Sequence, residues 1–327
     1  EEVKRFRNTH GGRSLDYTLQ VKAGVPYDIE LDFEYFRSDA QLNFDIGFKQ
    51  KVNIDASVAC VKDADVVVFA GGISPLLEGE EMGVNLPGFK GGDRTDIKLP
   101  AVQRELIHAL HRAGKKIILV NCSGSPIALE PETKNCEAIL QAWYPGQAGG
   151  TAVADVLFGD YNPGGRLPVT FYRNMSQLPD FEDYNMTGRT YRYMTQQPLF
   201  PFGYGLSYTT FEYGNLSLAK EQIKVGEPLK LTINVTNNGQ RDGEEVVQVY
   251  LKKQDDAEGP GKTLRAFKRV RIPAGKSVEV AFDLNGKELE WWDAQSNTMR
   301  VCAGRYDVMV GKSSQDRDLQ RRSFVIE

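Results

Sequence analysis

The spacing of hydrophobic residues changes twice along the 327-residue chain, and each change predicts a different architecture. In residues 1–50, hydrophobic and polar positions alternate, as they do in strands with one buried face. In residues 51–212, continuous hydrophobic runs alternate with segments whose hydrophobic residues have helical spacing. In residues 213–327 the simple alternation of hydrophobic and polar positions returns. We therefore predict a short β-rich amino-terminal segment, an α/β domain and an all-β domain.

The first 50 residues contain three alternating runs that we interpret as strands of an antiparallel sheet. The runs are Leu15–Val21, Tyr27–Phe33 and Leu42–Phe48, and Ala23-Gly24 supplies a turn signal between the first two. Three strands are few for an independent domain. The segment is therefore expected to be the end of a larger β domain.

The middle region alternates predicted strands with predicted helices. Buried strands are expected at 66–70, 117–120 and 138–143, with a proline-bearing edge strand at 167–171. Helices are expected near 54–61, from Pro100 to Ala113, and at 151–158 behind Gly146, Gly149 and Gly150. The hydrophobic face of the second helix is read as Val102, Leu106, Ala109, Leu110 and Ala113. This alternation predicts an α/β sandwich with a mostly parallel sheet and helices on both faces.

The last third of the chain has the pattern of a β-sandwich. Alternating runs lie at 229–235, 247–251, 278–282 and 306–310, and turn signals lie at Asn238-Gly239, Ala274-Gly275 and Asn285-Gly286. Short strands at this spacing are typical of immunoglobulin-like and fibronectin-like sandwiches.

Composition and charge make a nucleic-acid partner and a membrane span unexpected for this chain. A hydrophobic fraction of 41% and a charged fraction of 26% are ordinary for a folded soluble protein. The net charge is −4 and the basic residues are scattered, so a nucleic-acid surface is not expected. No hydrophobic run approaches the roughly 20 residues that cross a bilayer, so no membrane span is expected. Because the chain opens with Glu1-Glu2 rather than Met, we interpret it as a processed or excised piece.

No cofactor or metal is expected from the motifs. The four cysteines, at positions 60, 122, 136 and 302, have no CxxC spacing, so we interpret them as plain buried thiols rather than zinc ligands or a disulfide framework. The glycines before residue 151 lack both standard phosphate-binding patterns. Close packing of a helix on a strand explains them better than an anion site.

The strongest candidate for chemistry is the acidic stretch that follows the strand at 66–70. The segment 75–99 places Glu78, Glu80 and Glu81 at the carboxyl end of a parallel strand, where α/β proteins bind their ligands. A carboxyl group there can act as a general acid if its surroundings favour the protonated form. A solvated acidic loop is the alternative. The length of the loop favours a functional role.

Two further stretches carry weaker signals. Residues 121–126 resemble a nucleophile elbow only loosely, because Asn121 replaces the first glycine and no histidine is placed beside a serine. His108 and His111 are expected on the exposed side of a helix. In "DYNMTGRTYRYM", Tyr191 and Arg192 have side chains that suit sugar rings and hydroxyl groups, although simple packing explains them equally well.

The order of several motifs resembles the carboxyl-terminal half of family 3 glycoside hydrolases. The matching segments are "DVVVFAGG" at 65–72, "PLLEGEEMGVNLPGFKGGDRTD" at 75–96, "QAWYPGQAGGT" at 141–151, "DVLFGDYNPGGRLPVTF" at 155–171 and "FPFGYGLSYTTF" at 200–211. The resemblance covers residues 51 to 327 and includes the junction between an α/β sandwich and a fibronectin type III-like domain. Residues 1–50 look similar to the end of a PA14-type insert. The amino-acid sequence of the acidic loop is most similar to that of the bacterial β-xylosidase-like branch of the family.

The resemblance implies a retaining, exo-acting β-glycosidase, with β-xylosides favoured over β-glucosides and no cofactor. It implies a nucleophilic Asp on an amino-terminal (β/α)8 barrel, in the same parent protein or in a separate chain, and a general acid/base Glu on the α/β domain. Glu78, followed by glycine, matches the acid/base position, and Glu80 is the alternative. No segment here matches the barrel, so the chain alone is expected to be inactive. A bacterial periplasmic or secreted location is implied, and a non-catalytic carbohydrate-binding or structural fragment is the competing interpretation.

Overall fold

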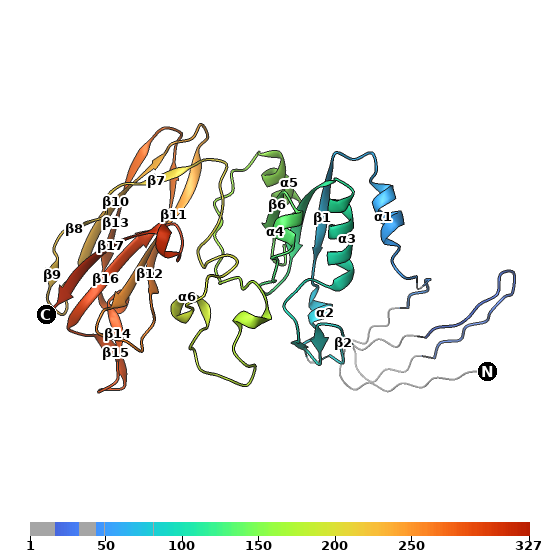
Figure 1. The fold of residues 1–327 in the computed structure, drawn as a ribbon, viewed down its shortest axis with the longest axis horizontal. Coiled ribbons are helices and arrows are strands. Elements are labelled where there is room, and N and C mark those ends of the chain that lie inside the picture. The colour runs from blue at the N-terminus through green and yellow to red at the C-terminus, as the bar shows by residue number, and fades with distance from the viewer. Residues whose placement is uncertain (1–16, 33–43, 49, 81) are drawn as a thin grey trace.

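The computed structural model describes residues 17–32, 44–48, 50–80 and 82–327. The molecule is elongated, with a β-sandwich at one end, an α/β unit toward the other and a loop-rich segment between them (Figure 1). This order of an α/β unit before an all-β unit is the order that the sequence pattern predicts.

A three-stranded parallel sheet forms the centre of the α/β unit. Its strands are β1 (Val66–Gly72), β5 (Lys116–Cys122) and β6 (Ala138–Gln141), in the order β1-β5-β6. All three carboxyl ends therefore lie at one edge of the sheet. Gly72, the last residue of β1, lies very close to the backbone of β5. A Cβ atom at this position would lie 1.8 Å from the carbonyl oxygen of Cys122, so only glycine fits.

The helices of this unit are α1 (Ile54–Cys60), α3 (Ala101–Arg112), α4 (Glu132–Asn135) and α5 (Gly149–Phe158). Helix α3 packs against β5 and α1. The hydrophobic face predicted for α3 is only partly right, since Val102 is 41% exposed whereas Ile107 and Leu110 are buried. Gln103 lies on the inner side because its amide group bonds both the N–H and the C=O of Gly72, each at 2.8 Å. A hydrophobicity pattern does not register that polar contact.

The acidic stretch after β1 is a folded insert. It contains α2 (Pro75–Glu78) and a small antiparallel sheet of β2 (Asn85–Leu86), β3 (Phe89–Lys90) and β4 (Asp93–Arg94). Phe89 is buried in the same hydrophobic core as Ile73 and Leu99, which flank the insert. The insert is therefore anchored to the α/β unit.

The carboxyl-terminal unit consists of two facing sheets. One contains β13 (Ser277–Leu284), β10 (Leu229–Asn237) and β7 (Phe211–Tyr213), with β8 (Ser217–Leu218) also paired to β10. The other contains β12 (Thr263–Ile272), β11 (Gly243–Lys253), β16 (Gly304–Gly311), β17 (Leu319–Ile326) and β9 (Gln222–Ile223). A separate hairpin, β14 (Glu290–Asp293) with β15 (Thr298–Val301), and short 3-10 turns, η2 (Gly286–Glu288) and η3 (Asp316–Asp318), complete the unit. Alternate residues of β10 and β11 fill the core between the sheets.

All four alternating runs predicted here lie within strands, but other strands escaped the pattern. Strand β12 carries Lys268, Arg269 and Arg271, and β17 carries Arg321 and Arg322, so neither shows a clean hydrophobic alternation. Both are held by ladders to neighbouring strands, which a single-sequence pattern does not contain.

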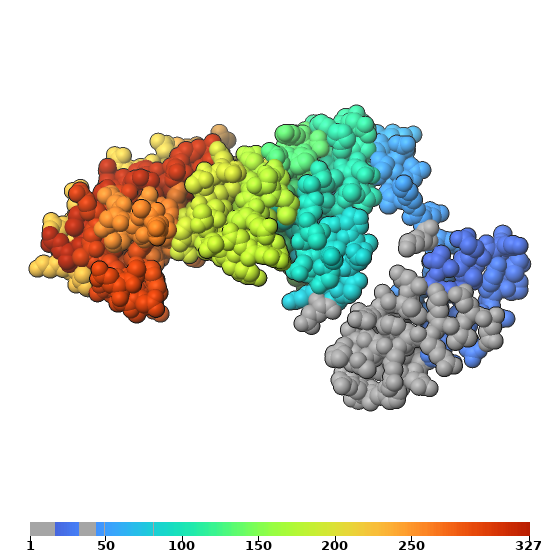
Figure 2. Space-filling model, turned by 60° about the horizontal axis from the view of Figure 1, so that its bottom comes forward, coloured from blue at the N-terminus to red at the C-terminus, as the bar shows by residue number. Residues whose placement is uncertain are grey.

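The segment between the two units fills the space between them, as the yellow-green surface in Figure 2 shows. It includes η1 (Met175–Gln177) and α6 (Thr190–Tyr193). The edge strand predicted at 167–171 is wrong, because only an isolated bridge joins Phe171 to Phe200. Pro168 has no N–H to donate, so the segment makes separate bonds to the loop at 199–204 instead of a continuous ladder.

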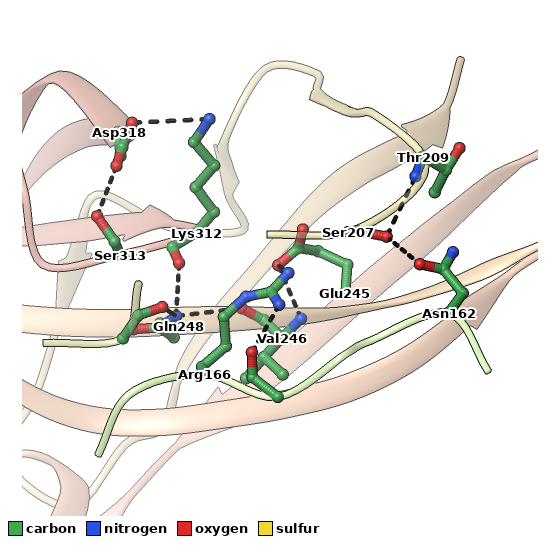
Figure 3. Close-up of polar contacts among 12 residues, drawn as sticks. Asn162, Arg166, Ser207, Thr209, Glu245, Val246, Gln248, Lys312, Ser313 and Asp318 are labelled. Atoms are coloured by element: carbon green, nitrogen blue, oxygen red, sulfur yellow. Dashed lines mark hydrogen bonds and ion pairs between the residues drawn. The ribbon is translucent and has the colours of Figure 1, made fainter. Parts of the chain in front are cut away.

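A buried polar network joins this segment to β11 (Figure 3). Arg166 donates to Glu245 at 3.0 Å, and the two side chains are only 8% and 3% exposed. The side-chain amide of Gln248 donates to the carbonyl oxygens of Gly203 and Lys312, at 3.1 and 2.7 Å. The motifs at 164–168 and 200–206 thus serve the junction with the sandwich.

The predicted amino-terminal strands are absent from the described part of that segment. Residues 17–32 and 44–48 contain no strand, and the hydrophobic side chains from Tyr17 to Leu31 are 41–61% exposed. Alternation produces a stable strand only where a second layer covers the hydrophobic face, and no described element covers this one. In Figure 2 the dark-blue residues, which belong to 17–32, stand apart from the α/β surface. Residues 1–16 and 33–43, which hold the rest of the predicted strands, lie outside the described residues.

Candidate active site

Glu78 is the last residue of α2, at the carboxyl edge of the parallel sheet. Ser74 caps the helix by accepting a hydrogen bond from the N–H of Leu77 at 3.2 Å, and Pro75 occupies the first turn. Gly79 ends the helix in the left-handed region, with φ of 64°. One short turn, with a start signal and a stop signal in the local sequence, therefore sets the position of Glu78.

Two hydroxyl groups hold the carboxylate of Glu78. Ser125 Oγ donates to Glu78 Oε1 at 3.0 Å, and the phenol of Tyr144 donates to Glu78 Oε2 at 2.7 Å. Ser125 lies in the loop after β5, and Tyr144 lies in the loop after β6. Three chain segments that leave the same edge of the sheet thus meet at one carboxylate.

Arg94, at the end of the insert, connects this group to the backbone. Its guanidinium donates to Ser125 Oγ at 3.1 Å and to the carbonyl oxygens of Pro126, Asp96 and Lys98 at 3.3, 3.0 and 3.2 Å. It also lies 5.9 Å from the ring centroid of Phe89. Arg94 therefore pins the insert to the loop after β5 and places a positive charge near Glu78.

A second layer of amides supports Ser125 from inside the sheet. Ser123 Oγ donates to the carbonyl oxygen of Ser125 at 2.8 Å. Asn121 and Gln141, at the ends of β5 and β6, bond each other at 2.7 Å and donate to Ser123 Oγ at 3.1 and 3.2 Å. The buried Oδ1 atom of Asn121 has no partner among the described residues. Hydrogen bonds thus run without interruption from the sheet to Glu78.

The electrostatics of the cluster keep its donors in their donating forms. Burial raises the pKa of Tyr144 to about 12, and the hydrogen bond from its phenol to Glu78 acts in the same direction. Burial lowers the pKa of Arg94, while the negative charges of Glu78 and Asp96 oppose that shift. At neutral pH the phenol is protonated and the guanidinium is charged, so both groups act as hydrogen-bond donors.

The other glutamates of the loop are placed differently. Glu80 is exposed, and no hydrogen bond or ion pair links it to another residue in the described part of the chain. Glu81 lies outside the described residues. Of the three glutamates that the sequence singles out, Glu78 is thus the one seen in contact with the strand ends.

Tyr191 and Arg192, predicted to contact sugar, are joined to the β-sandwich. The Tyr191 ring stacks on Phe202 with centroids 4.4 Å apart, and its hydroxyl oxygen accepts from the N–H of Leu264 at 3.2 Å. The carbonyl oxygen of Arg192 accepts from the N–H of Gly261 at 2.7 Å. No described contact links either residue to Glu78. Packing accounts for both, and sugar binding by them stays a prediction.

The remaining candidates are accounted for by packing or by exposure. His108 and His111 lie exposed on α3, as expected, and neither contacts Ser123 or Ser125. Gly149 permits a close approach, since a Cβ atom there would lie 2.3 Å from the Pro145 ring. All four cysteines are free thiols, but the prediction that they are buried is wrong. Cys60 is exposed at the open end of α1, and Cys122, Cys136 and Cys302 are only partly buried.

Two features are absent from the residues that the structure describes. No group of three or more His, Cys, Asp or Glu side chains there could hold a metal ion. None of the helices in this part of the chain has the length and hydrophobicity that a membrane crossing requires.

Sequence reasoning found Glu78 but missed the residues around it. In the sequence, Ser125 belongs only to the loose elbow motif, Tyr144 suits either a sugar site or the core, and Arg94 carries no signal of its own. The available signal was positional, because Ser125 and Tyr144 follow predicted parallel strands and the carboxyl ends of such strands meet at one edge.

Comparison with known proteins identifies both units. Residues 6–208 match the family model described as Glycosyl hydrolase family 3 C-terminal domain, and residues 245–314 match a Fibronectin type III-like domain. A xylan 1,4-beta-xylosidase of Xylanibacter ruminicola is 52% identical over 309 residues, covering 94% of this chain and 36% of that protein. A periplasmic beta-glucosidase of Salmonella typhimurium is 37% identical over 276 residues, covering 80% of this chain and 34% of that protein.

Solved structures agree with this assignment. A β-glucosidase from Erythrobacter marinus matches with a TM-score of 0.72 and 36% identity, covering 84% of this chain and 36% of that chain. The chain thus spans roughly a third of the length of the relatives it matches. Taken together, the two domain matches and these relatives show that the chain belongs to glycoside hydrolase family 3, of which it represents the carboxyl-terminal part.

Proposed function

We propose that this chain supplies the general acid/base glutamate of a retaining, exo-acting β-glycosidase, and that the residue is Glu78. In such a reaction one carboxyl group protonates the departing oxygen and then, as carboxylate, removes a proton from the incoming water. The nucleophilic Asp lies on a (β/α)8 barrel that this chain does not contain, in the same parent protein or in a separate chain.

The observation that carries this proposal is the way in which Glu78 is held. A carboxylate at the carboxyl edge of a parallel sheet, bonded on both oxygens and connected to the strand ends, is presented in a fixed orientation. An exposed acidic loop without function needs none of these supports. Glu80, the alternative, has no such support among the described residues.

The expected substrates are terminal β-linked sugars, with β-xylosides preferred to β-glucosides. The preference rests on the 52% identity to a protein named as a xylan 1,4-beta-xylosidase, compared with 37% to one named as a beta-glucosidase. The catalytic carboxyl groups of retaining enzymes stand about 5–5.5 Å apart, so Glu78 alone supports no turnover.

The same comparisons suggest the wider setting. We propose domain boundaries at residues 1–50, 51–212 and 213–327, with helices covering both faces of the parallel sheet. The first segment would be the end of a PA14-like insert. The relative from Salmonella is named as periplasmic, which favours a periplasmic or secreted location.

The test is reconstitution of activity. The 327-residue chain is fused to, or co-expressed with, the amino-terminal portion of the Xylanibacter ruminicola relative, and hydrolysis of p-nitrophenyl β-xyloside and β-glucoside is measured. We expect no hydrolysis by the chain alone and hydrolysis, faster for the xyloside, by the combination. Glu78→Gln should lower the rate of the combination about 10²- to 10⁴-fold, the range that general acid catalysis contributes.

The matched control is Glu80→Gln, which removes an equal charge from the same loop and should retain activity. A dinitrophenyl glycoside separates the acid role from folding, because its leaving group departs without a proton and Glu78→Gln should slow its release much less. Full activity of Glu78→Gln, or loss of activity only in Glu80→Gln, would refute the assignment. A well-folded combination without any hydrolysis would favour the non-catalytic interpretation.

A further inference from the structure

Tyr144 is bound at the strand end by more than its hydrogen bond to Glu78. Its ring lies on Gly124, in the loop after β5, where a Cβ atom would stand only 2.6 Å from Tyr144 Cε2. Gly124 is not among the residues with positive φ, so its backbone conformation is open to any residue. The glycine is therefore required for space, and the space that it leaves is occupied by the Tyr144 ring.

The residue before Tyr144 has a strained backbone. Trp143 has φ of 57°, in the left-handed region that a bulky side chain rarely adopts. It follows the end of β6 by two residues, and its ring packs edge-on against Phe171 at 6.2 Å between centroids. The turn therefore packs the Trp143 ring against Phe171 and directs the next residue, Tyr144, toward Glu78.

We propose that Tyr144 is a positioning residue for Glu78, and that Gly124 and the strained Trp143 exist to place its phenol against the carboxylate. Ser125 holds the opposite oxygen, so the carboxylate is clamped between donors from two different strand ends. Glu78, the catalytic carboxylate that we assign to this chain, is thus already oriented before the chain contacts a barrel domain. The inference rests on the proposed acid/base function of Glu78 and deepens it.

Chemistry requires such a clamp because proton transfer depends on orientation. A general acid must present one oxygen to the leaving group within hydrogen-bond distance, and a displacement of 1 Å can cost about 10²-fold in rate. The phenol suits this role because its pKa of about 12 keeps it a neutral donor at the pH where a glycosidase works.

The experiment compares Tyr144→Phe, which removes the donor, with Gly124→Ala, which keeps every hydrogen-bonding group and only displaces the ring. The controls are Tyr208→Phe, which removes a phenol bonded to a backbone carbonyl of α5, and Gly150→Ala, where no atom lies within 4 Å of the new Cβ. Urea unfolding checks that each variant is folded.

The first readout needs no activity. The 327-residue chain is labelled with ¹³Cζ-tyrosine, and the Tyr144 signal is identified by its loss in Tyr144→Phe. Glu78→Gln removes a negative charge that raises the pKa of Tyr144, so the phenol should titrate at lower pH. Gly124→Ala should shift the same signal, and the Gly150→Ala control should leave it in place.

The second readout is the kinetics of the reconstituted enzyme. Tyr144→Phe and Gly124→Ala should each lower kcat by about 10- to 10²-fold while KM changes little, because binding groups are untouched. A dinitrophenyl leaving group departs without an acid, so both variants should release the first dinitrophenol at close to the unsubstituted rate. The hydrolysis step that follows, in which Glu78 acts as base, should be slower in both variants. Slow release of that first dinitrophenol would indicate structural damage and overturn the proposal.

The two hypotheses fail in different ways. If Glu78→Gln abolishes activity but Tyr144→Phe and Gly124→Ala do not lower kcat, Glu78 is the acid/base and the positioning role is refuted. If Glu78→Gln leaves activity intact, the proposed function fails and the positioning role falls with it. If the Tyr144 phenol titrates at the same pH in Glu78→Gln as in the unsubstituted chain, the contact is absent in solution, which also overturns the inference.

Discussion

At the scale of single residues, Arg94 joins separate chain segments of the candidate site. One guanidinium satisfies three backbone carbonyls and a hydroxyl, and so joins the insert to the loop after β5. Arginine suits this position because its planar fork offers several donors in fixed directions, which a lysine ammonium does not. The same residue that organises the insert also places a positive charge close enough to Glu78 for the two charges to interact.

We therefore expect Arg94→Lys to be far from conservative. The change keeps the charge but leaves carbonyl oxygens of Pro126, Asp96 or Lys98 without their donor, at a cost of about 1–3 kcal/mol in the free energy of unfolding. Urea unfolding of the 327-residue chain measures it, with Arg112→Lys on the exposed end of α3 as the control. Equal stability of the two variants would contradict the role given to Arg94.

At the scale of elements, the junction between the loop segment and β11 depends on a buried ion pair. Arg166 and Glu245 are almost fully covered, and burial raises the pKa of Glu245 even though Arg166 opposes that shift. Breaking one partner of such a pair leaves a buried charge without compensation, whereas replacing both by hydrophobic groups is often neutral.

Arg166→Met alone should therefore cost about 3–5 kcal/mol in the free energy of unfolding, and Arg166→Met with Glu245→Leu should recover most of that loss. Denaturant unfolding of the two single variants and the double variant forms a complete cycle. If the double variant is as unstable as the sum of the single variants, the pair is not coupled and the junction is held by other contacts.

At the scale of the whole molecule, acid should destabilise the fold through its surface carboxylates. The pKa of Asp242 is lowered by the N–H of Ala274 and by Arg271, and the pKa of Asp293 is lowered by Ser296, Gln295 and Arg300. A carboxyl group whose pKa is lowered on folding adds stability above its unfolded value of 3.8, and that stability is lost as pH falls through its folded value. Glu245, with a raised pKa, acts in the opposite direction.

We expect the free energy of unfolding to fall between about pH 5 and about pH 2, and Asp242→Asn with Asp293→Asn to flatten this dependence. Urea titrations across that range provide the measurement, and the difference between the variant and the unsubstituted chain should vanish at the acid end. A difference that persists unchanged to the lowest pH would mean that these carboxylates contribute through packing rather than through charge.

The sequence by itself determined the features that depend on neighbouring residues. Continuous hydrophobic runs, alternation and signals such as Pro100 predicted three parallel strands, the three longest helices and four strands of the sandwich, because their causes lie within a few residues. The acidic loop at the end of β1 identified Glu78 as a candidate for the same reason. The motif order also showed a resemblance to the family, which the comparisons confirm.

Only the tertiary structure decided what depends on contacts between distant segments. It paired Tyr144 and Ser125 with Glu78 across more than 40 positions of sequence, turned Gln103 inward to bond Gly72, and replaced the predicted edge strand after Arg166 by irregular bonds. It also assigned Tyr191 to packing against the β-sandwich. Hydrogen-bond partners and covered faces are properties of meeting surfaces, so the residue pattern of a single segment does not contain them.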